Sequence, residues 1–322
     1  MAIEHATACA LPKPWGIPDL RPWSNARHDG GLIGEIWYER SGAAAADPSL
    51  LLKLLFTSQP LSIQVHPDDA YAQSIGLPNG KTEAWYVLSA SPDAKIALGL
   101  KQHLTPQQLR QAIDDGSLSN LVVWQAVAPG DSFLVTAGTI HAIGAGLVIA
   151  EIQQRSDATF RLFDYGRQRE LHVDNAVAAA DAGPAHFQAQ PSRLTDERTL
   201  LISSPYFVVE RIALAPNSTW CLEAEQETWF LVLSGDARAG SFDIATGEAL
   251  FVQSDSVDFH AGPTGLVGLV AYAGASPAPL LLQRVGQPGA MDRGPSQAAQ
   301  GPSFLPRAKN ATSTNEYLEV FQ

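Results

Sequence analysis

An apolar segment that contains tryptophan occurs twice in the chain, and this repeat limits the folds that the chain can adopt. Residues 83–89 (EAWYVLS) resemble residues 227–234 (ETWFLVLS), and each copy is followed by a Gly-acidic turn, a strand pattern and one histidine, His141 or His260. A jelly-roll barrel closes its strand edges within one compact unit and can therefore be duplicated as a unit. The repeat predicts two small barrels in tandem, and a chance likeness of two strands is the alternative.

Short apolar runs separated by turn residues fill most of the chain. Its 26 Gly and 22 Pro residues bound runs that are rich in β-branched and aromatic residues, which is typical of strands rather than of long helices. In the first half, the predicted strands are 32–38, 61–65, 84–88, 95–100, 121–127, 131–135, 147–153 and 159–163. A second strand-rich block extends from residue 206 to about residue 282. The chain is therefore predicted to be all-β.

Three short helices are expected beside the strands. The most regular covers residues 105–116, with an N-cap threonine, a proline at the first helical position and a glutamine that completes a capping box. An alanine-rich stretch at 173–182 is the second. The third is a short helix at 71–75, for which Asp68 and Asp69 are expected to act as caps rather than in catalysis.

The composition changes at two points and suggests three parts. Residues 1–190 are predicted to form the first barrel, and residues 191–285 the second. Residues 286–322 are rich in Gly, Pro, Ser, Ala and Asn and show no periodicity, so a flexible tail is expected. A docking role for the apolar end of this tail, residues 317–321, is the alternative.

The formal net charge of -12 argues against nucleic acid and anionic membranes as partners, because both would be repelled at long range. An anionic substrate would need a local cationic pocket. Four arginines lie within one short segment of this acidic chain, and they are Arg155, Arg161, Arg167 and Arg169. They predict such a pocket, with a solvated arginine surface as the alternative.

The two cysteines, Cys9 and Cys221, are far apart in the sequence and form no CxxC pair. Neither a disulfide framework nor a thiolate metal site is therefore indicated, and a reducing cytoplasm is the expected location. The N-terminus lacks a basic region followed by an apolar core, and the apolar run at 50–56 is short and contains Lys53. We expect no targeting segment and no membrane span.

Metal-capable side chains cluster in the first half of the chain. Gln64 and His66 lie at i and i+2, so on a strand both point to the same face. Glu83 opens the next apolar run, and His141 follows a glycine-lined turn. Imidazole and carboxylate groups without thiolate suit Zn²⁺ or another divalent first-row ion. The alternative for Gln64 and His66 is a barrel-lining pair satisfied by hydrogen bonds; the lone His260 is expected to be structural.

Several motifs in this order resemble class I mannose-6-phosphate isomerases, in their short bacterial form. They are residues 13–16 (KPWG), 34–37 (GEIW), 62–69 (SIQVHPDD), 80–86 (GKTEAWY) and the segment 137–167. The likeness covers most of the first barrel and, more weakly, the second. It implies two tandem cupin domains and a metal-dependent interconversion of D-mannose 6-phosphate and D-fructose 6-phosphate. A phosphosugar is then the expected small-molecule partner.

The resemblance also implies which residues act. Gln64, His66, Glu83 and His141 would be the ligands of one Zn²⁺ ion, with water or a substrate oxygen completing the shell. Because the catalytic proton passes between C1 and C2, the reaction needs a base and cationic groups that stabilise an enediolate.

Three further residues match the catalytic positions of the family. Lys81 would be the base, with a pKa lowered by burial beside the metal, Asp157 would hold or relay its proton, and Arg161 would stabilise the enediolate. An ion pair with Glu83 or Asp68 is the alternative role for Lys81.

Two positions depart from the family pattern. Gly80 stands where longer members carry a histidine proposed to help ring opening, and Thr136 replaces a common proline.

A non-catalytic, sugar-binding metal cupin is the alternative function, although such a protein has no need of a base. An iron-dependent oxygen-using cupin is disfavoured by the arginine-rich segment.

Overall fold

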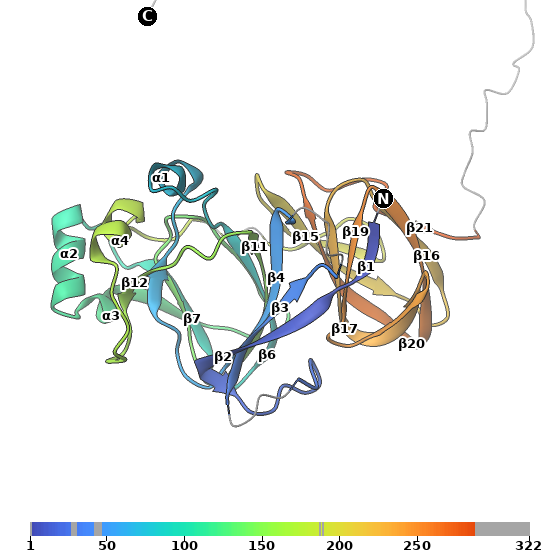
Figure 1. Cartoon of the computed structure of the whole chain (residues 1–322), viewed down its shortest axis with the longest axis horizontal. Coiled ribbons are helices and arrows are strands. Elements are labelled where there is room, and N and C mark those ends of the chain that lie inside the picture. The colour runs from blue at the N-terminus through green and yellow to red at the C-terminus, as the bar shows by residue number, and fades with distance from the viewer. Residues whose placement is uncertain (1, 27–30, 42–46, 187, 189, 287–322) are drawn as a thin grey trace, which may run out of the picture. The chain divides into compact units, whose positions relative to one another are not determined.

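A computed structural model describes residues 2–26, 31–41, 47–186, 188 and 190–286, and it is built mainly of antiparallel strands (Figure 1). The predicted all-β fold with a few short helices is confirmed. The predicted tail lies outside the described residues except for Gly286. No helix in the described part of the chain is long and apolar enough to cross a bilayer.

Two sheets form the first barrel. The six-stranded sheet contains, in spatial order, β2 (Thr7–Ile17), β3 (Ile33–Glu39), β4 (Leu50–Thr57), β11 (Leu147–Gln154), β6 (Glu83–Ala90) and β9 (Ser132–Val135). The five-stranded sheet contains β12 (Phe160–Phe163), β5 (Ile63–Val65), β10 (His141–Ile143), β7 (Lys95–Leu100) and β8 (Val122–Ala126). Buried side chains from both sheets, among them Trp85, Ile96 and Ile149, share one hydrophobic cluster.

The second barrel is a ten-stranded sheet. Its main path runs through β1 (Ala2–His5), β19 (Ala249–Gln253), β17 (Thr228–Ala239), β20 (Asp255–Ala273), β15 (Phe207–Leu214), β14 (Arg198–Ser203) and β13 (Ser192–Arg193). Three more strands pair beside this path, and they are β16 (Thr219–Ala224), β18 (Phe242–Ala245) and β21 (Leu282–Arg284). The N-terminal strand β1 thus pairs with β19 of this sheet. The division of the chain into domains at residue 190 stays a prediction.

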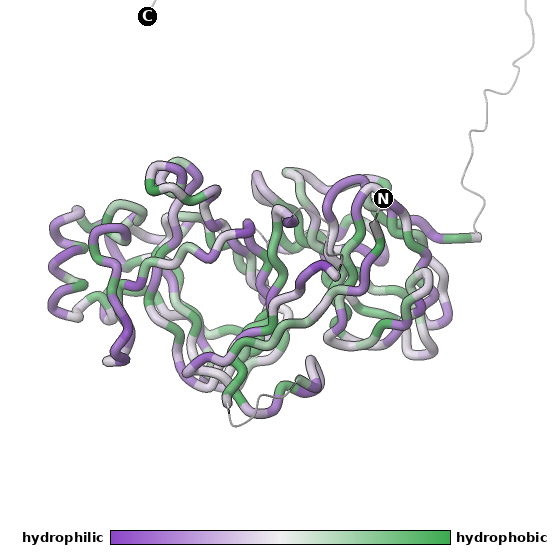
Figure 2. The backbone as a smooth tube through the Cα atoms, in the orientation of Figure 1, coloured by the Kyte–Doolittle hydropathy of each residue, from purple (hydrophilic) through white to green (hydrophobic). Residues whose placement is uncertain are grey.

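The four helices of the described chain are α1 (Asp69–Ser74), α2 (Pro106–Asp114), α3 (Leu118–Leu121) and α4 (Val173–Ala179). The capping box before α2 is confirmed, because Thr105 and Gln108 exchange side-chain hydrogen bonds with each other's backbone N–H groups. Asp68 caps α1 by accepting from the N–H of Tyr71 at 2.7 Å. Asp69 has other partners, described below. Figure 2 shows α2, which lies next to α3 and α4, as largely hydrophilic.

Strands β2 and β4 are absent from the predicted set for opposite reasons. β2 lies at the edge of its sheet and contains two prolines, which an edge strand tolerates. All eight residues of β4 are buried, so its sequence LLLKLLFT lacks the alternation of a half-exposed strand.

Candidate metal centre

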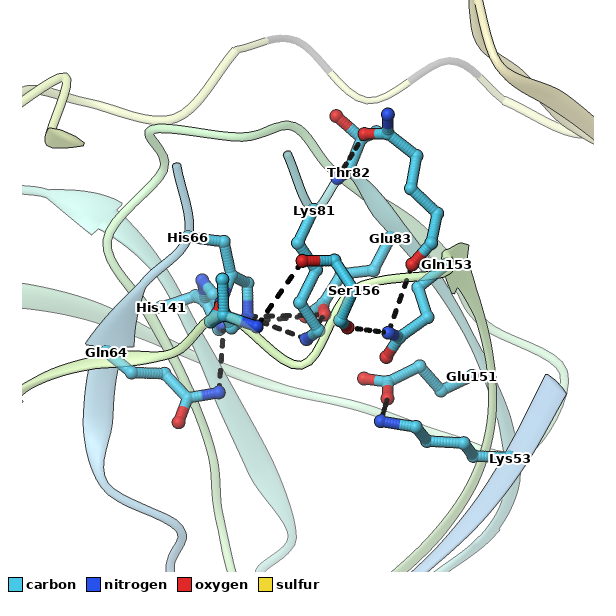
Figure 3. Close-up of polar contacts among 12 residues, drawn as sticks. Lys53, Gln64, His66, Lys81, Thr82, Glu83, His141, Glu151, Gln153 and Ser156 are labelled. Atoms are coloured by element: carbon cyan, nitrogen blue, oxygen red, sulfur yellow. Dashed lines mark hydrogen bonds and ion pairs between the residues drawn. The ribbon is translucent and has the colours of Figure 1, made fainter. Parts of the chain in front are cut away.

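Three buried side chains at the ends of three strands meet inside the first barrel (Figure 3). His66 follows β5, Glu83 begins β6, and His141 begins β10. Their nearest ligand-capable atoms lie within 4.8 Å of one another. His66 Nε2 is 3.3 Å from Glu83 Oε2, and His141 Nε2 is 3.4 Å from Glu83 Oε1. The pairing of β5 with β10 and the packing of the two sheets thus bring together residues that are up to 75 positions apart in the sequence.

Backbone carbonyl groups orient both imidazoles. Nδ1 of His66 donates to the Ala158 carbonyl at 2.7 Å, and Nδ1 of His141 donates to the Thr139 carbonyl at 2.8 Å. Because a carbonyl can only accept, these bonds fix the tautomer and leave each Nε2 without a proton. Burial, followed by the Lys81 charge, lowers the pKa of His66 to about 3. Burial also lowers the pKa of His141. Both rings are therefore neutral and suited to bind a metal ion.

The Glu83 carboxylate is charged and incompletely satisfied. Burial alone would raise its pKa, but the charge of Lys81 and contacts with His66 hold this pKa well below its ordinary value. Glu83 Oε1 is buried and has no hydrogen-bond partner among the described residues. It faces His141 Nε2, another acceptor. A cation bound between Glu83 Oε1 and His141 Nε2 would satisfy the carboxylate oxygen that has no hydrogen-bond donor, so this donor set fits a metal ion.

Gln64 lies beside this group. Gln64 is the backbone pairing partner of His141 between β5 and β10, and its amide Nε2 is 3.3 Å from His141 Nε2. Gln64 Oε1, the atom that would bind a metal, accepts from the Ser62 hydroxyl at 3.1 Å. The structure therefore brings the fourth predicted ligand to the edge of the group, with its amide nitrogen turned towards it.

Lys81 reaches the same group from the segment before β6. Its ammonium contacts Glu83 Oε2 and lies 2.9 Å from His66 Nε2. Burial would lower the pKa of Lys81, but the charges of Glu83 and Glu151 raise it above its ordinary value. In this arrangement Lys81 makes the ion pair with Glu83 that was the alternative prediction, and its pKa shifts opposite to the expected direction.

A cavity of about 330 Å³ opens beside the three side chains. Charged and polar groups from both sheets and the adjoining loops line it, including Lys13, Lys53, Gln64, Lys81, Glu151, Asp157, Arg161, Arg169 and His172. The predicted residues Lys81, Asp157 and Arg161 thus share one cavity. The Arg161 Nε–H donates to the Glu170 carbonyl at 3.0 Å. No carboxylate pairs with this guanidinium within the described residues.

The arginine cluster divides into two groups. Arg161 and Arg169 line the cavity, and the proximity of Arg169, after burial, lowers the pKa of Arg161. Arg155 instead bonds to Glu39 at 2.7 Å. Arg167 pairs with Asp164 and donates to the Pro60 carbonyl. Two of the four arginines, Arg161 and Arg169, thus contribute to a cationic cavity, and Arg169 shares the carboxylate of Asp164 with Arg167.

Two buried ionisable residues of the cavity were not predicted from the sequence. Lys53 of β4 pairs across the sheet with Glu151 of β11, and their charged atoms are 3.7 Å apart. The indole N–H of Trp85 donates to Glu151 Oε1 at 3.1 Å. Burial, with the charge of Glu83, raises the pKa of Glu151 to about 7. A charged residue inside an otherwise apolar strand was the available signal at both positions.

The backbone around Gly80 leaves no room for a side chain, which accounts for the departure from the family pattern at this position. A Cβ atom at this position would lie 2.5 Å from the Asp68 carbonyl carbon and 2.6 Å from the Pro67 carbonyl oxygen. No side chain fits there without moving the loop before α1. Position 80 therefore contributes no side chain to the cavity, whereas His172 lines it from another segment.

The tandem barrels and the buried His/Glu/His group define a protein of the cupin class with a group that could hold a metal ion. Over 205 residues the chain is 42% identical to the mannose-6-phosphate isomerase of Streptococcus mutans, and over 224 residues it is 34% identical to the mannose-6-phosphate isomerase ManA of Bacillus subtilis. The chain belongs to the mannose-6-phosphate isomerase family. The first alignment covers 61% of this chain and 63% of the relative, and the second covers 65% and 70%.

Solved structures share the fold. The mannose 6-phosphate isomerase of Bacillus subtilis matches with a TM-score of 0.73 and 24% identity, over 84% of this chain and 100% of that one. A mannose 6-phosphate isomerase described as bound with zinc and yttrium matches with a TM-score of 0.67 and 15% identity, over 85% and 100%. No family model matches the chain.

Proposed function

We propose that this chain interconverts D-mannose 6-phosphate and D-fructose 6-phosphate in the cavity of the first barrel, using a metal ion held by His66, Glu83 and His141. The main supporting observation is that two neutral imidazoles and a carboxylate meet next to Gln64 and Lys81, which line a cavity with several cationic groups. Membership of the isomerase family favours this function over a non-catalytic sugar-binding cupin. The cationic cavity also disfavours an oxygen-using iron enzyme.

Zinc is the proposed metal, with Gln64 Oε1 as the fourth protein ligand after rotation of its amide. Ligands of the imidazole and carboxylate type suit zinc, and a solved structure of similar fold is described as bound with zinc. When bound, the ion would supply Lewis-acid polarisation of the sugar oxygens. A cytoplasmic location is part of the same proposal, supported by two cysteines that form no disulfide.

Proton transfer and charge stabilisation are assigned to side chains of the cavity. Lys81 transfers the proton between C1 and C2, and Asp157, whose charge acts on Lys81, assists it. Glu151 is a second candidate for proton transfer, because a pKa of about 7 allows a group to accept and release a proton near neutral pH. Arg161 faces the enediolate. A preorganised donor of this kind typically contributes roughly 3 to 4 kcal/mol to lowering a barrier.

The phosphate end is assigned to the region around Arg169. Its guanidinium lies over the Trp15 ring, 5.2 Å from the centroid, and near Arg161. The Trp15 indole N–H is buried without a hydrogen-bond partner among the described residues. Asp164 holds the Arg169 guanidinium through two hydrogen bonds, at 2.7 and 2.6 Å. Together with Arg161 and the free indole N–H, this guanidinium forms a suitable contact surface for a dianion.

The test is a coupled assay of fructose 6-phosphate formation from mannose 6-phosphate. We expect purified protein to lose activity after chelation and to regain it with Zn²⁺. We also expect Lys81→Met to keep its bound zinc but lose at least 100-fold in kcat, as removal of a proton-transfer group does. Absence of isomerisation in protein with stoichiometric zinc would show that the proposed reaction is wrong.

A further inference from the structure

Asp69 connects the two barrels. Tyr206, in the turn between β14 and β15, donates a hydrogen bond from its hydroxyl to Asp69 Oδ2 at 3.0 Å. The other oxygen of Asp69 accepts from the Gly80 N–H at 2.8 Å and from Gln154 Nε2 at 3.0 Å. One carboxylate therefore links the ten-stranded sheet to the end of β11 and to the segment that leads into β6.

Gln154 extends this connection to the peptide between Lys81 and Glu83. The side-chain oxygen of Gln154 accepts from the Thr82 N–H at 2.9 Å, and the backbone N–H of Gln154 donates to the Thr82 carbonyl at 3.0 Å. Thr82 is thus held on both sides of its backbone. Its neighbours in the chain are Lys81, which is assigned the proton transfer, and Glu83, which is assigned to the metal.

The segment has little freedom to move once these bonds form. The Lys81 N–H donates to the Pro67 carbonyl at 3.0 Å. Gly80 packs against the same loop so closely that a Cβ atom would overlap its backbone. A shift at Asp69 would therefore be passed to Lys81 and Glu83 through short, direct contacts rather than absorbed by a flexible loop.

We propose that Asp69, held by Tyr206 of the second barrel, is a positioning residue that fixes the Lys81-Thr82-Glu83 segment in the geometry needed for metal binding and proton transfer. The second barrel thereby takes part in the reaction through one tyrosine hydroxyl. The inference rests on the proposed function. Burial would raise the pKa of Asp69, but hydrogen bonds from Gly80, Gln154 and Tyr206 lower it, so the carboxylate stays a charged acceptor at neutral pH.

The test is Tyr206→Phe, which removes only the hydroxyl. The matched control is Tyr71→Phe. Tyr71 lies in helix α1, as Asp69 does, but its hydroxyl donates to Asn175 Oδ1 at 3.0 Å and does not reach the site. We expect Tyr206→Phe to lower kcat and Zn²⁺ affinity by about 3- to 10-fold, with KM little changed, as loss of one hydrogen bond to a charged group allows. Tyr71→Phe should leave kcat, KM and Zn²⁺ affinity at parental values.

Asp69→Asn should have the larger effect, about 10- to 100-fold in Zn²⁺ affinity, as removal of a partner that orients metal ligands does. Affinity is measured by competition with a chromophoric zinc chelator. The proposal is overturned if both variants keep parental kcat and affinity, or if Tyr206→Phe changes them no more than Tyr71→Phe does. If Asp69→Asn does not fold, Tyr206→Phe decides.

The experiments test the proposed reaction and the positioning role of Asp69 independently. A parent protein that binds zinc tightly but does not isomerise mannose 6-phosphate would contradict the proposed reaction. The zinc affinities of Tyr206→Phe and Tyr71→Phe would still decide whether the hydroxyl of the second barrel positions Glu83.

Discussion

At the scale of single residues, the cavity combines charged groups with very different proton affinities. The neighbouring Lys81 ammonium lowers the pKa of Glu83 and keeps this carboxylate deprotonated. Glu151 lies 3.7 Å from its partner Lys53, and burial together with the charge of Glu83 raises its pKa. The pKa values of two carboxylates inside one barrel are therefore shifted in opposite directions. Such a separation allows one carboxylate to act as a permanent ligand and the other to exchange protons.

Replacement of Glu151 by Gln should change how stability depends on pH. The pKa of Glu151 rises from 4.5 to about 7 on folding, so between these values the folded state binds a proton that the unfolded state has released. The free energy of unfolding should therefore fall as the pH rises from about 4.5 to 7, and this part of the slope should be missing in Glu151→Gln. Urea denaturation of metal-free protein at several pH values measures both slopes. Parallel slopes for the two proteins would contradict the shifted pKa.

At the scale of elements, the two copies of the repeat use the same glutamate differently. Glu83 begins β6 and faces the metal-capable group, whereas Glu227, just before β17, binds the start of β4 in the other barrel. Its carboxylate accepts from the N–H and hydroxyl of Ser49 at 2.6 and 2.7 Å, and from the Leu50 N–H at 2.9 Å. The strand that carries Lys53 is therefore anchored by the second barrel.

Glu227→Gln should weaken this anchor. An amide presents an N–H₂ group to donors that need an acceptor, so we expect the free energy of unfolding to fall by about 1 to 3 kcal/mol. The matched control is Glu225→Gln, the same change two residues away on the exposed turn. Urea denaturation at neutral pH measures both variants. Equal stability of Glu227→Gln and Glu225→Gln would show that the contacts with Ser49 and Leu50 contribute little.

At the scale of the whole molecule, the barrels share one hydrophobic core. Ile36 and Leu54 of the six-stranded sheet belong to the same buried cluster as Phe207, Trp229 and Phe251 of the ten-stranded sheet. Neither barrel can lose its partner without exposing these side chains to water. Burial of this kind is the main favourable term in folding, so the barrels should stabilise each other.

Thermal unfolding of the full chain should therefore show one cooperative transition. Phe207→Ala, which empties a fully buried site in the shared cluster, should lower the free energy of unfolding by about 3 to 5 kcal/mol and move the whole transition. Leu280→Ala, at a side chain that is 64% exposed, is the control and should have little effect. Calorimetry at constant zinc concentration measures these shifts. Two separate transitions, of which Phe207→Ala moves only one, would contradict a shared core.

Local sequence patterns determined much of the fold and the centre of the site. The capping box before α2, the Gly- and Pro-bounded strands and the repeat each depend on residues close in the chain, so they can be read directly. The i, i+2 spacing of Gln64 and His66 is local in the same way, whereas Glu83 and His141 were joined to them by the family motifs. The family motifs added Lys81, Asp157 and Arg161, and all three line the cavity.

Only the tertiary structure decided how distant charges meet. Lys53 and Glu151 pair because β4 and β11 are neighbours in the sheet, and no local pattern encodes that register. The arginines divide because each guanidinium turns to the carboxylate or carbonyl that packing brings within reach. The role of Asp69 depends on Tyr206, which is 137 residues away. Sequence patterns record local preference, whereas a buried charge is placed by partners that the folded chain brings to it.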